Sequence, residues 1–521
     1  MPVLQEDFPE PRRPGRKGWN MSSANPLFPR SFGVLLHPTS LPGAHGIGDL
    51  GAGARQWLDW LQAAGCSLWQ VLPLVPPGAA NSPYASASAM SCNTSLIDLY
   101  QLVHDGLLHD RELPHPQFGQ QLDHTFVQTE KAKALDKAAE RLRTQRNHPL
   151  YEACVAWSKQ APWVLDAALF SSVHAHFGDI PWWQWPADIR DRTPAALTQW
   201  GQALGPAVER YVALQFLFDR QWQQLRDYAR QRGIRTLGDA PIYVDADSVD
   251  VWANRSLFQL DAHGRSRHVA GVPPDYFSEL GQFWGNPLYD WAAMAQTGYR
   301  WWIARVRRCL QQTDLVRIDH FRGFSKYWAI PADAADARSG RWQPGPGKAL
   351  FVALRSALGA LPLVAEDLGD IDDDVHQLRD FADLPGMHVL QFAWGGNTDS
   401  PFLPHHHRPN AVVYTGTHDN DTTTGWWRAN PQVHGQVRAY VRPQDPDIAW
   451  EFVRLACSSV ANTAIAPLQD LLGLGSEARM NVPGVTDGNW GWRVPPGAFD
   501  RERAEKLLEL IGMFDRLPRS R

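Results

Sequence analysis

Short apolar runs and helical periods alternate along most of the chain. Residues 32–38 (FGVLLHP) form an apolar run that stops at a proline, which predicts a buried strand. Apolar residues then recur at helical spacing from Ala54 to Leu61, and Gly65 is a typical helix stop. A second apolar run over residues 66–74 predicts another strand. Strand, helix and strand in this order predict a βαβ unit in a parallel sheet.

Two long insertions interrupt this pattern. Residues 76–232 begin as a Pro- and Ser-rich loop and then become mostly helical. Within them, residues 129–145 are charged and Ala-rich, which predicts a solvated helix. Residues 206–232 begin with a proline and end before a glycine, as a long amphipathic helix would. A second insertion, residues 245–300, is predicted to carry a lid and substrate loops.

The strand pattern returns after the first insertion. Six further strands are predicted over residues 234–244, 314–321, 361–369, 386–394, 410–420 and 463–470. Eight parallel strands with helical crossovers predict a (β/α)8 barrel over residues 27–521, with no C-terminal β-sandwich domain. Residues 1–26 are rich in Pro, Arg and Ser without periodicity, which predicts a mobile N-terminal tail.

Composition narrows the class of protein. Hydrophobic residues make up 44% and charged residues 20% of the 521, as in a soluble globular protein with a large core. A net charge of −5 without a basic patch argues against a nucleic-acid partner, and no apolar run approaches membrane length. Five cysteines without a CxxC motif, and no secretory signal, favour the cytoplasm. Whether the protein is a monomer or a homo-oligomer stays open.

The chain has 24 tryptophans, an unusual number. Two explanations stay open: core packing, or flat surfaces that contact the apolar faces of sugar rings. No cofactor and no metal are predicted. The histidines at 405–407 are consecutive on an extended segment and do not face one ion, and the acid run at 370–375 lacks EF-hand spacing and predicts a helix start.

Several predicted strands end in an acid. These are Asp239, Asp319, Glu366 with Asp367, and Asp419. Each alone would be explained by a salt bridge or a helix cap. Barrels of this type place their chemistry at the carboxyl ends of the strands, so together these acids predict a catalytic rim.

Enzymes that cleave glycosidic bonds usually use a pair of catalytic carboxylates. One attacks the anomeric carbon and the other protonates the leaving oxygen, at a separation of about 5–5.5 Å in retaining enzymes. In LVRIDHFRG (residues 315–323), Arg317 precedes Asp319 by two residues and shares its strand face. Asp319 is therefore half of an ion pair, a catalytic carboxylate, or both.

Several motifs now show a family resemblance. The order RIDHFRG, AEDLG and THDN resembles the α-amylase clan. Longer segments are similar to the 4-α-glucanotransferases (amylomaltase or disproportionating enzyme, glycoside hydrolase family 77), over about residues 30–520. These are LLHPTSLPGAHGIGDLG, WQVLPL, NSPYASASA, GDAPIYVDADSVDVW, GVPPDYFSELGQFWGNPLYDW and LGSEARMNVPG.

The resemblance implies a catalytic triad. Asp319 would be the nucleophile that forms a covalent β-glycosyl-enzyme, Glu366 the acid/base, and Asp419 the group that stabilises the transition state. The implied reaction moves α-1,4-glucan segments from a maltooligosaccharide or starch-type donor to an acceptor glucan or glucose. An amylase-type hydrolase and a non-catalytic glucan-binding protein are the alternatives.

The resemblance also implies substrate-binding residues. Arg317 would orient the nucleophile, His320 and His418 would lie beside the reacting sugar, Asp239 would be a supporting acid, and Tyr84 would stack under the reacting ring.

Two loops complete these expectations. The segment GVPPDYFSELGQFWGNP, residues 271–287, corresponds to the family's lid beside the acceptor sites, with Tyr276, Phe277 and Trp284 as its aromatic candidates. The loop ANSPYASASAMSCNTSL keeps Tyr84 but departs from the family's usual residues around Cys92.

Overall fold

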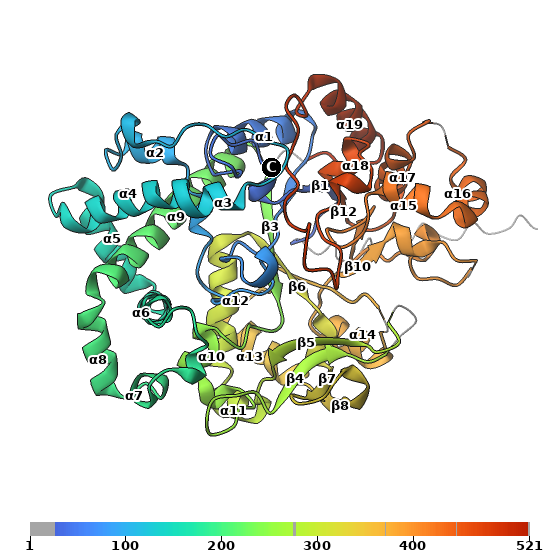
Figure 1. The fold of residues 1–521 in the computed structure, drawn as a ribbon. Coiled ribbons are helices and arrows are strands. Elements are labelled where there is room, and N and C mark those ends of the chain that lie inside the picture. Colours follow the sequence, from blue (N-terminus) through green and yellow to red (C-terminus); the bar gives the residue numbers. More distant parts are fainter. Residues whose placement is uncertain (1–26, 275–277, 370, 397, 444, 519–521) are drawn as a thin grey trace, which may run out of the picture.

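Eight parallel strands form a barrel at the centre of the molecule (Figure 1). The computed structural model describes residues 27–274, 278–369, 371–396, 398–443 and 445–518, so the predicted tail at 1–26 lies outside the described residues. The strand order is β10-β11-β12-β1-β2-β3-β6-β9. The amide of Ala365 in β9 donates to the carbonyl of Pro385, next to β10, at 2.9 Å, which closes the ring. The strands are β1 (Ser31–Leu35), β2 (Leu68–Gln70), β3 (Arg235–Pro241), β6 (Leu315–Asp319), β9 (Leu363–Ala365), β10 (Gly386–Val389), β11 (Ala411–Tyr414) and β12 (Thr463–Pro467).

All eight predicted strands are present, and the predicted (β/α)8 barrel is confirmed. Each is shorter than the apolar run that predicted it, because the run continues into the loop at the carboxyl end. Gly33 in β1 shows how closely the strands pack. A Cβ at this position would lie 2.7 Å from the Cβ of Leu68 in β2, so only glycine fits here.

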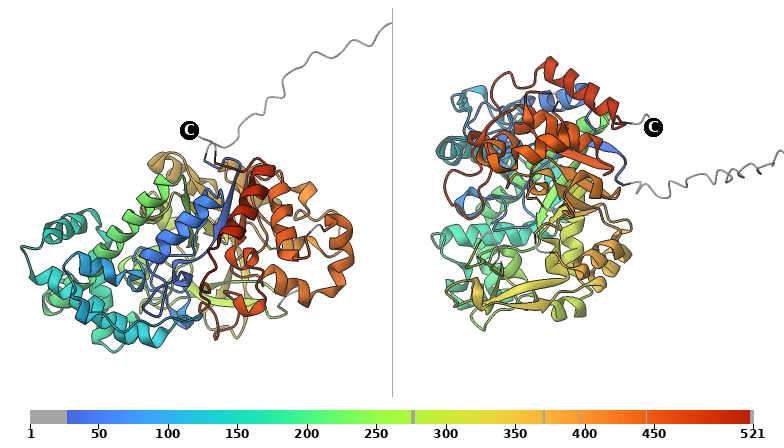
Figure 2. Two further views of the ribbon diagram at one scale, coloured as in Figure 1. Left: turned by 90° about the horizontal axis from the view of Figure 1, so that it is seen from above. Right: turned by 90° about the vertical axis from the view of Figure 1, so that its right-hand side faces the viewer.

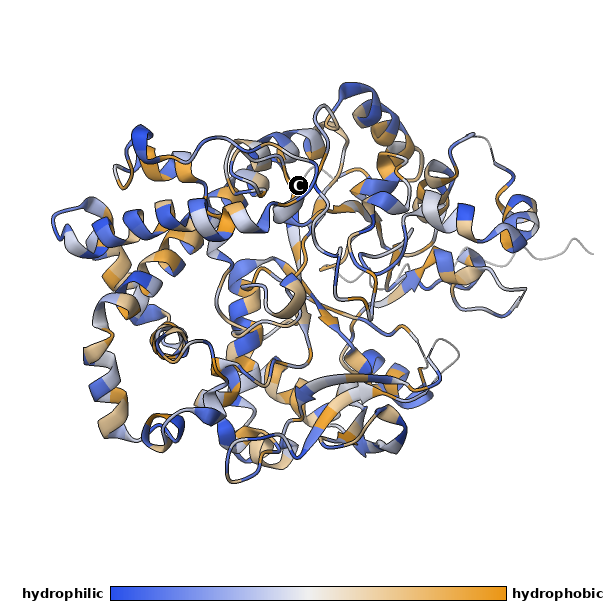
Figure 3. Cartoon of the chain, in the orientation of Figure 1, coloured by the Kyte–Doolittle hydropathy of each residue, from blue (hydrophilic) through white to orange (hydrophobic). Residues whose placement is uncertain are grey.

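Helices surround the barrel and carry hydrophobic and hydrophilic residues along their length (Figure 3). The helices outside the insertions are α1 (Ala52–Ala63), α12 (Arg300–Gln312), α13 (Lys348–Leu358), α14 (Asp373–Phe381), α15 (Thr423–Ala429), α16 (His434–Val441), α17 (Ile448–Ser458), α18 (Leu468–Leu471) and α19 (Arg501–Met513). Within the described residues, no helix is long and apolar enough to cross a membrane.

The insertion at 76–232 is mostly helical and forms the side of the molecule opposite α15–α17 (Figures 1 and 2). It contains α2 (Leu99–His104), α3 (His124–Phe126), α4 (Ala132–Thr144), α5 (Pro149–Gln160), α6 (Trp163–His176), α7 (Ala187–Arg190), α8 (Pro194–Ala203) and α9 (Gly205–Gln231). The charge of residues 129–145 had suggested a solvated helix, but α4 is not fully solvated. Its face with Leu135, Ala138 and Leu142 is buried, and α4 packs against α9.

A second sheet was not predicted. It has four antiparallel strands in the order β5-β4-β7-β8, below the barrel in Figure 1. They are β4 (His268–Val272), β5 (Gln282–Pro287), β7 (Lys326–Pro331) and β8 (Arg341–Pro344). The ends of the predicted lid loop thus form the paired strands β4 and β5. The second insertion also holds α10 (Val249–Ala253) and α11 (Trp291–Gln296).

The two sequence features set aside as metal sites have structural roles. Asp372 caps α14 by accepting the amide of Val375, so the acid run begins a helix, as predicted. His407 is buried, with Nδ1 2.7 Å from Oγ of Ser459. Among the described residues, no group of three or more His, Cys, Asp or Glu side chains is placed to hold a metal ion.

A buried arginine joins the C-terminal segment to the barrel. The guanidinium of Arg516 is fully buried and donates to six backbone carbonyls at 2.8–3.2 Å. These belong to Ser31, Ala456, Cys457, Ser459, Ala461 and Asn462. Burial is the main cause that lowers the pKa of Arg516, to about 9. This one side chain therefore holds the starts of β1 and β12 to the end of α17.

The contribution of this anchor to stability is testable. Arg516→Met removes six buried hydrogen bonds, although Arg30 still donates to three of these carbonyls, so we expect it to lower the free energy of unfolding by about 1–3 kcal/mol. The midpoint of urea-induced unfolding measures the effect. Arg501→Met is the matched control, because Arg501 lies on the surface of α19, where it pairs with Glu505 and its side chain is 90% exposed. Equal shifts in the two variants would contradict the anchoring role.

Candidate active site

Arg317 links two carboxylates at the carboxyl ends of neighbouring strands. The register of β3 and β6 sets Asp239 opposite Arg317. Nη1 of Arg317 lies 2.7 Å from Oδ2 of Asp239, and Nη2 lies 2.7 Å from Oδ1 of Asp319. Arg317 and the side chain of Asp239 are buried, whereas the side chain of Asp319 remains 30% exposed. The predicted ion pair exists, and it leaves Asp319 open to a ligand.

Asp239 is the buried end of this chain of contacts. Its Oδ2 also accepts the hydroxyl of Tyr84 at 2.8 Å. Burial raises the pKa of Asp239, and the guanidinium of Arg317 opposes that rise. Asp239 therefore fixes both Arg317 and Tyr84.

Three aromatic rings from distant loops meet beside these carboxylates. The ring of Tyr84 stacks on that of His418, with centroids 5.2 Å apart and planes at 6°. Trp490 packs against both, at 5.8 Å from Tyr84 and 6.0 Å from His418. Its backbone is left-handed, with φ of 64°, a conformation that non-glycine residues rarely adopt. The stack places the ring of Tyr84 beside the carboxylates, and its contact with a sugar ring stays a prediction.

Glu366 is held against the end of β6. Its Oε2 accepts the amide of His320 at 2.7 Å, and its Oε1 accepts the amide of Leu368 at 2.9 Å. Burial raises the pKa of Glu366 to about 7; Arg317 lowers it and Asp319 raises it. A carboxyl with this pKa is still partly protonated at neutral pH, which suits a group that acts first as an acid and then as a base.

The neighbouring acid, Asp367, has a different environment. Its Oδ2 pairs with Nη1 of Arg379 at 2.6 Å, and its Oδ1 accepts the amide of Met387 at 2.7 Å. Of the two acids that end the fifth strand, only Glu366 lies beside Asp319.

Asp419 is oriented by a segment that follows β12. Its Oδ1 accepts from Nδ2 of Asn481 at 2.7 Å and lies 3.3 Å from Nε2 of His418. Arg479 donates to the backbone carbonyl of Asp419. The side chain of Asp419 is still 41% exposed, so it can contact a ligand.

His320 occupies the turn directly after Asp319. Its backbone is left-handed, with φ of 52°, and burial lowers the pKa of its ring to about 4. The imidazole of His320 and the indole of Trp284, on β5, make a T-shaped contact, with ring centroids 4.8 Å apart. Trp284 thus connects the predicted lid segment to the carboxylates. Tyr276 and Phe277 lie outside the described residues.

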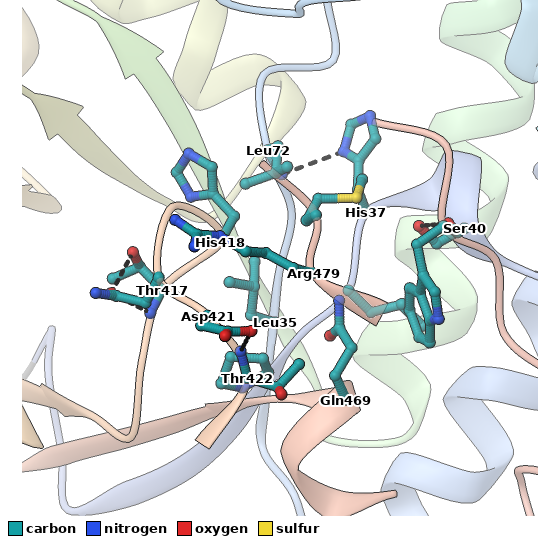
Figure 4. A pocket seen from close by; sticks show the side chains of 15 residues that line it. Leu35, His37, Ser40, Leu72, Thr417, His418, Asp421, Thr422, Gln469 and Arg479 are labelled. Carbon is teal, nitrogen blue, oxygen red and sulfur yellow. Dashed lines mark hydrogen bonds between the residues drawn. The ribbon is translucent and has the colours of Figure 1, made fainter. Parts of the chain in front are cut away.

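A small cavity lies beneath the turn that carries Asp419 (Figure 4). Its volume is about 30 Å³, with His37, His418 and Arg479 in its wall. This space suits water rather than a sugar ring. Burial lowers the pKa of His37 to about 3, and its Nδ1 accepts the amide of Leu72 at 3.2 Å. The cavity therefore lies below the turn and is too small for a sugar ring.

Nine of the eleven predicted site residues form one connected region. They are Tyr84, Asp239, Trp284, Arg317, Asp319, His320, Glu366, His418 and Asp419. Sequence analysis missed Arg479, Asn481 and Trp490. The first two lie in LGSEARMNVPG, which carried a family resemblance but no predicted role, and Trp490 had no signal of its own.

Comparisons with known proteins agree with this geometry. The family model described as 4-alpha-glucanotransferase matches residues 36–499. The chain belongs to the 4-alpha-glucanotransferase family. It is therefore a glycosyltransferase that moves segments of 4-α-linked glucan.

Individual relatives of the 4-alpha-glucanotransferase family cover nearly the whole chain. The potato chloroplastic/amyloplastic enzyme is 46% identical over 99% of this chain and 91% of its own length. The Synechocystis enzyme is 48% identical over 94% and 98%. The structure of amylomaltase from Streptococcus agalactiae in complex with acarbose superposes with a TM-score of 0.90, at 35% identity over 94% and 99%.

The shared guanidinium gives a testable prediction. Arg317→Met leaves Asp239 buried without a cation, so we expect a loss of about 3–5 kcal/mol in stability and a severe loss of transfer. Adding Asp239→Asn removes the uncompensated charge and should restore part of the stability, but not the activity. Urea unfolding and a maltotriose transfer assay measure the two effects. A double variant no more stable than Arg317→Met would contradict this account.

Proposed function

We propose that this chain transfers α-1,4-glucan segments by retaining double displacement, with Asp319 as the nucleophile, Glu366 as the acid/base and Asp419 as the group that stabilises the transition state. One observation carries the proposal. The carboxyl of Glu366 accepts a hydrogen bond from the amide of His320, which follows Asp319, and the pKa of Glu366 is raised. Asp319, in contrast, is paired with Arg317. Two neighbouring carboxyls are thus prepared for opposite roles.

The first step breaks the donor's glycosidic bond. An Oδ atom of Asp319 attacks the anomeric carbon as the bond to the leaving oxygen breaks, and the carboxyl of Glu366 gives its proton to that oxygen. The products are a covalent β-glycosyl-enzyme and a shortened glucan. In the second step Glu366 takes the proton from an acceptor hydroxyl, whose oxygen attacks the same carbon and releases Asp319.

Neighbouring side chains bind the reacting sugar in this proposal. Tyr84 stacks against its ring, while His320 and His418 flank it and Asp419 accepts hydrogen bonds from its hydroxyls. The exposed fraction of Asp419 and its bond to Asn481 support that role. Arg317 and Asp239 act by orienting Asp319 and Tyr84.

The donor and acceptor are maltooligosaccharides or dextrins from starch or glycogen. The acarbose complex of the Streptococcus agalactiae amylomaltase supports this substrate class. The segment 271–287 would act as a lid, with Trp284 and the predicted aromatics Tyr276 and Phe277 beside the acceptor. A lid favours transfer because an acceptor glucan must react before water does. A cytoplasmic location remains a prediction, since the potato relative is named chloroplastic/amyloplastic.

Product analysis with maltotriose separates transfer from hydrolysis. We expect glucose together with a ladder of longer oligosaccharides. Asp319→Asn should lower turnover by at least about 10³-fold, because no covalent intermediate forms. Asp373→Asn is the matched control, an exposed acid in the first turn of α14. Glucose and maltose without longer products would refute transfer, and an active Asp319→Asn would refute the nucleophile.

The pKa of Glu366 predicts a pH profile. Because the first step needs its proton, kcat/KM should fall about tenfold per pH unit above pH 7. Glu366→Gln should abolish transfer from maltotriose but retain the first cleavage of α-maltosyl fluoride, whose leaving group needs no proton, with fluoride released as a burst because the second step lacks its base. If a residually active Glu366→Gln enzyme showed the same fall in kcat/KM above pH 7, another group would be responsible for that fall.

The same pKa has a consequence for stability. Glu366 has a folded-state pKa above its usual 4.5, so its protonated form favours the folded state. Its stabilising contribution is complete below about pH 4.5 and is lost as pH rises through about 7. Glu366→Gln should therefore gain stability over the wild type above pH 7 and lose that advantage below pH 4.5.

A further inference from the structure

A second, larger cavity lies away from the catalytic carboxylates. Its volume is about 540 Å³. It lies between α10, the amino ends of α6 and α12, and the loop at 88–90 (elements labelled in Figure 1). None of the residues assigned above to the reaction lines it.

The wall of this cavity combines aromatic and polar groups. Trp163 and the largely buried Trp301, which is 7% exposed, line it, together with Asp250, Asn254 and Arg300. The guanidinium of Arg308 lies 4.8 Å from the ring centroid of Trp163, and Trp163 remains half-buried where it lines the cavity. Aromatic rings with a few polar groups are the usual lining of a site for a small organic ligand, and indoles suit the apolar faces of sugars.

Asp250 is the unusual group in this wall. It is only 4% exposed, yet it borders an open cavity. Its Oδ2 accepts the amide of Ala89 at 2.7 Å, and burial raises its pKa. A buried carboxylate costs free energy unless it is well hydrogen-bonded, and hydroxyl groups of a ligand would supply such bonds.

The loop at 84–90 separates the cavity from the catalytic site. Tyr84 stacks in the catalytic site, whereas Ser88 and Met90 line the cavity. Two contacts fix the cavity side of the loop: the amide of Ala89 on Asp250, and Nε of Arg308 on the carbonyl of Met90 at 3.0 Å. A ligand in the cavity would therefore lie behind the loop that presents Tyr84.

We propose that this cavity is a second binding site for a segment of α-1,4-glucan, distinct from the catalytic site. The ligand class rests on the proposed function, because the enzyme's substrate is the polymer with matching chemistry. A long glucan held at two places has a raised effective concentration at the catalytic site. A trisaccharide cannot occupy both, so the effect depends on chain length.

The experiment compares kcat/KM for amylose and for maltotriose in the full-length protein. Ser256→Trp fills the cavity from its exposed rim, and Trp163→Ala removes an aromatic wall. We expect each to lower kcat/KM for amylose at least about fivefold and to leave that for maltotriose within about twofold. Ser171→Trp, at an exposed position of α6 outside the cavity, is the matched control.

A binding measurement accompanies the kinetics. Retardation in native gels containing glycogen should be weaker for Ser256→Trp than for Ser171→Trp. If Trp163→Ala does not fold, Ser256→Trp alone decides. The second site would be overturned if Ser256→Trp and the wild type had the same ratio of kcat/KM for amylose to kcat/KM for maltotriose, and the same retardation. That result would not affect the proposed chemistry. An active Asp319→Asn would overturn the nucleophile without affecting the second site.

Discussion

The buried guanidinium of Arg317 between Asp239 and Asp319 is the interaction on which the catalytic site depends. Two carboxylates so close together, one of them fully buried, repel each other unless a cation lies between them. The barrel provides this arrangement because β3 and β6 are neighbours, although the second insertion separates them in sequence. From Asp239 the contacts pass to Tyr84, then to the ring of His418 and on to Asp419. A displacement of Arg317 would thus shift all of these side chains.

Local environment, not residue type, assigns a role to each acid. Glu366 and Asp367 are adjacent at the end of β9, and side chains of successive strand residues point to opposite sides. Glu366 accordingly faces the end of β6, whereas Asp367 turns to Arg379 and the start of β10. One acid has a pKa raised to about 7, which suits the proposed proton donor, and the other joins the end of β9 to the start of β10.

The barrel was predictable because each of its strands lies within a mostly apolar run and is largely buried. The second sheet was not, because β4 pairs with β7, which follows it in the sequence only after the barrel strand β6. The acids of the site were found at strand ends and by motif. Arg479 and Asn481 were not predicted, since their contacts with Asp419 arise only when a loop folds back over the barrel. Of the two explanations for the tryptophans, packing holds for at least six, since Trp57, Trp69, Trp182, Trp222, Trp252 and Trp302 are fully buried.

The unpredicted sheet bears on why transfer competes with hydrolysis. A lid that excludes water must return to one position beside the acceptor, so its base has to be rigid. The two ends of segment 271–287 are strands of a four-stranded sheet, and β7 of that sheet follows directly from the turn after Asp319. Trp284, on β5, contacts the ring of His320 in that same turn. The two ends of the proposed lid and the turn after Asp319 are therefore connected through one sheet, and in the proposed mechanism this connection aligns the acceptor with the glycosyl-enzyme before water can react.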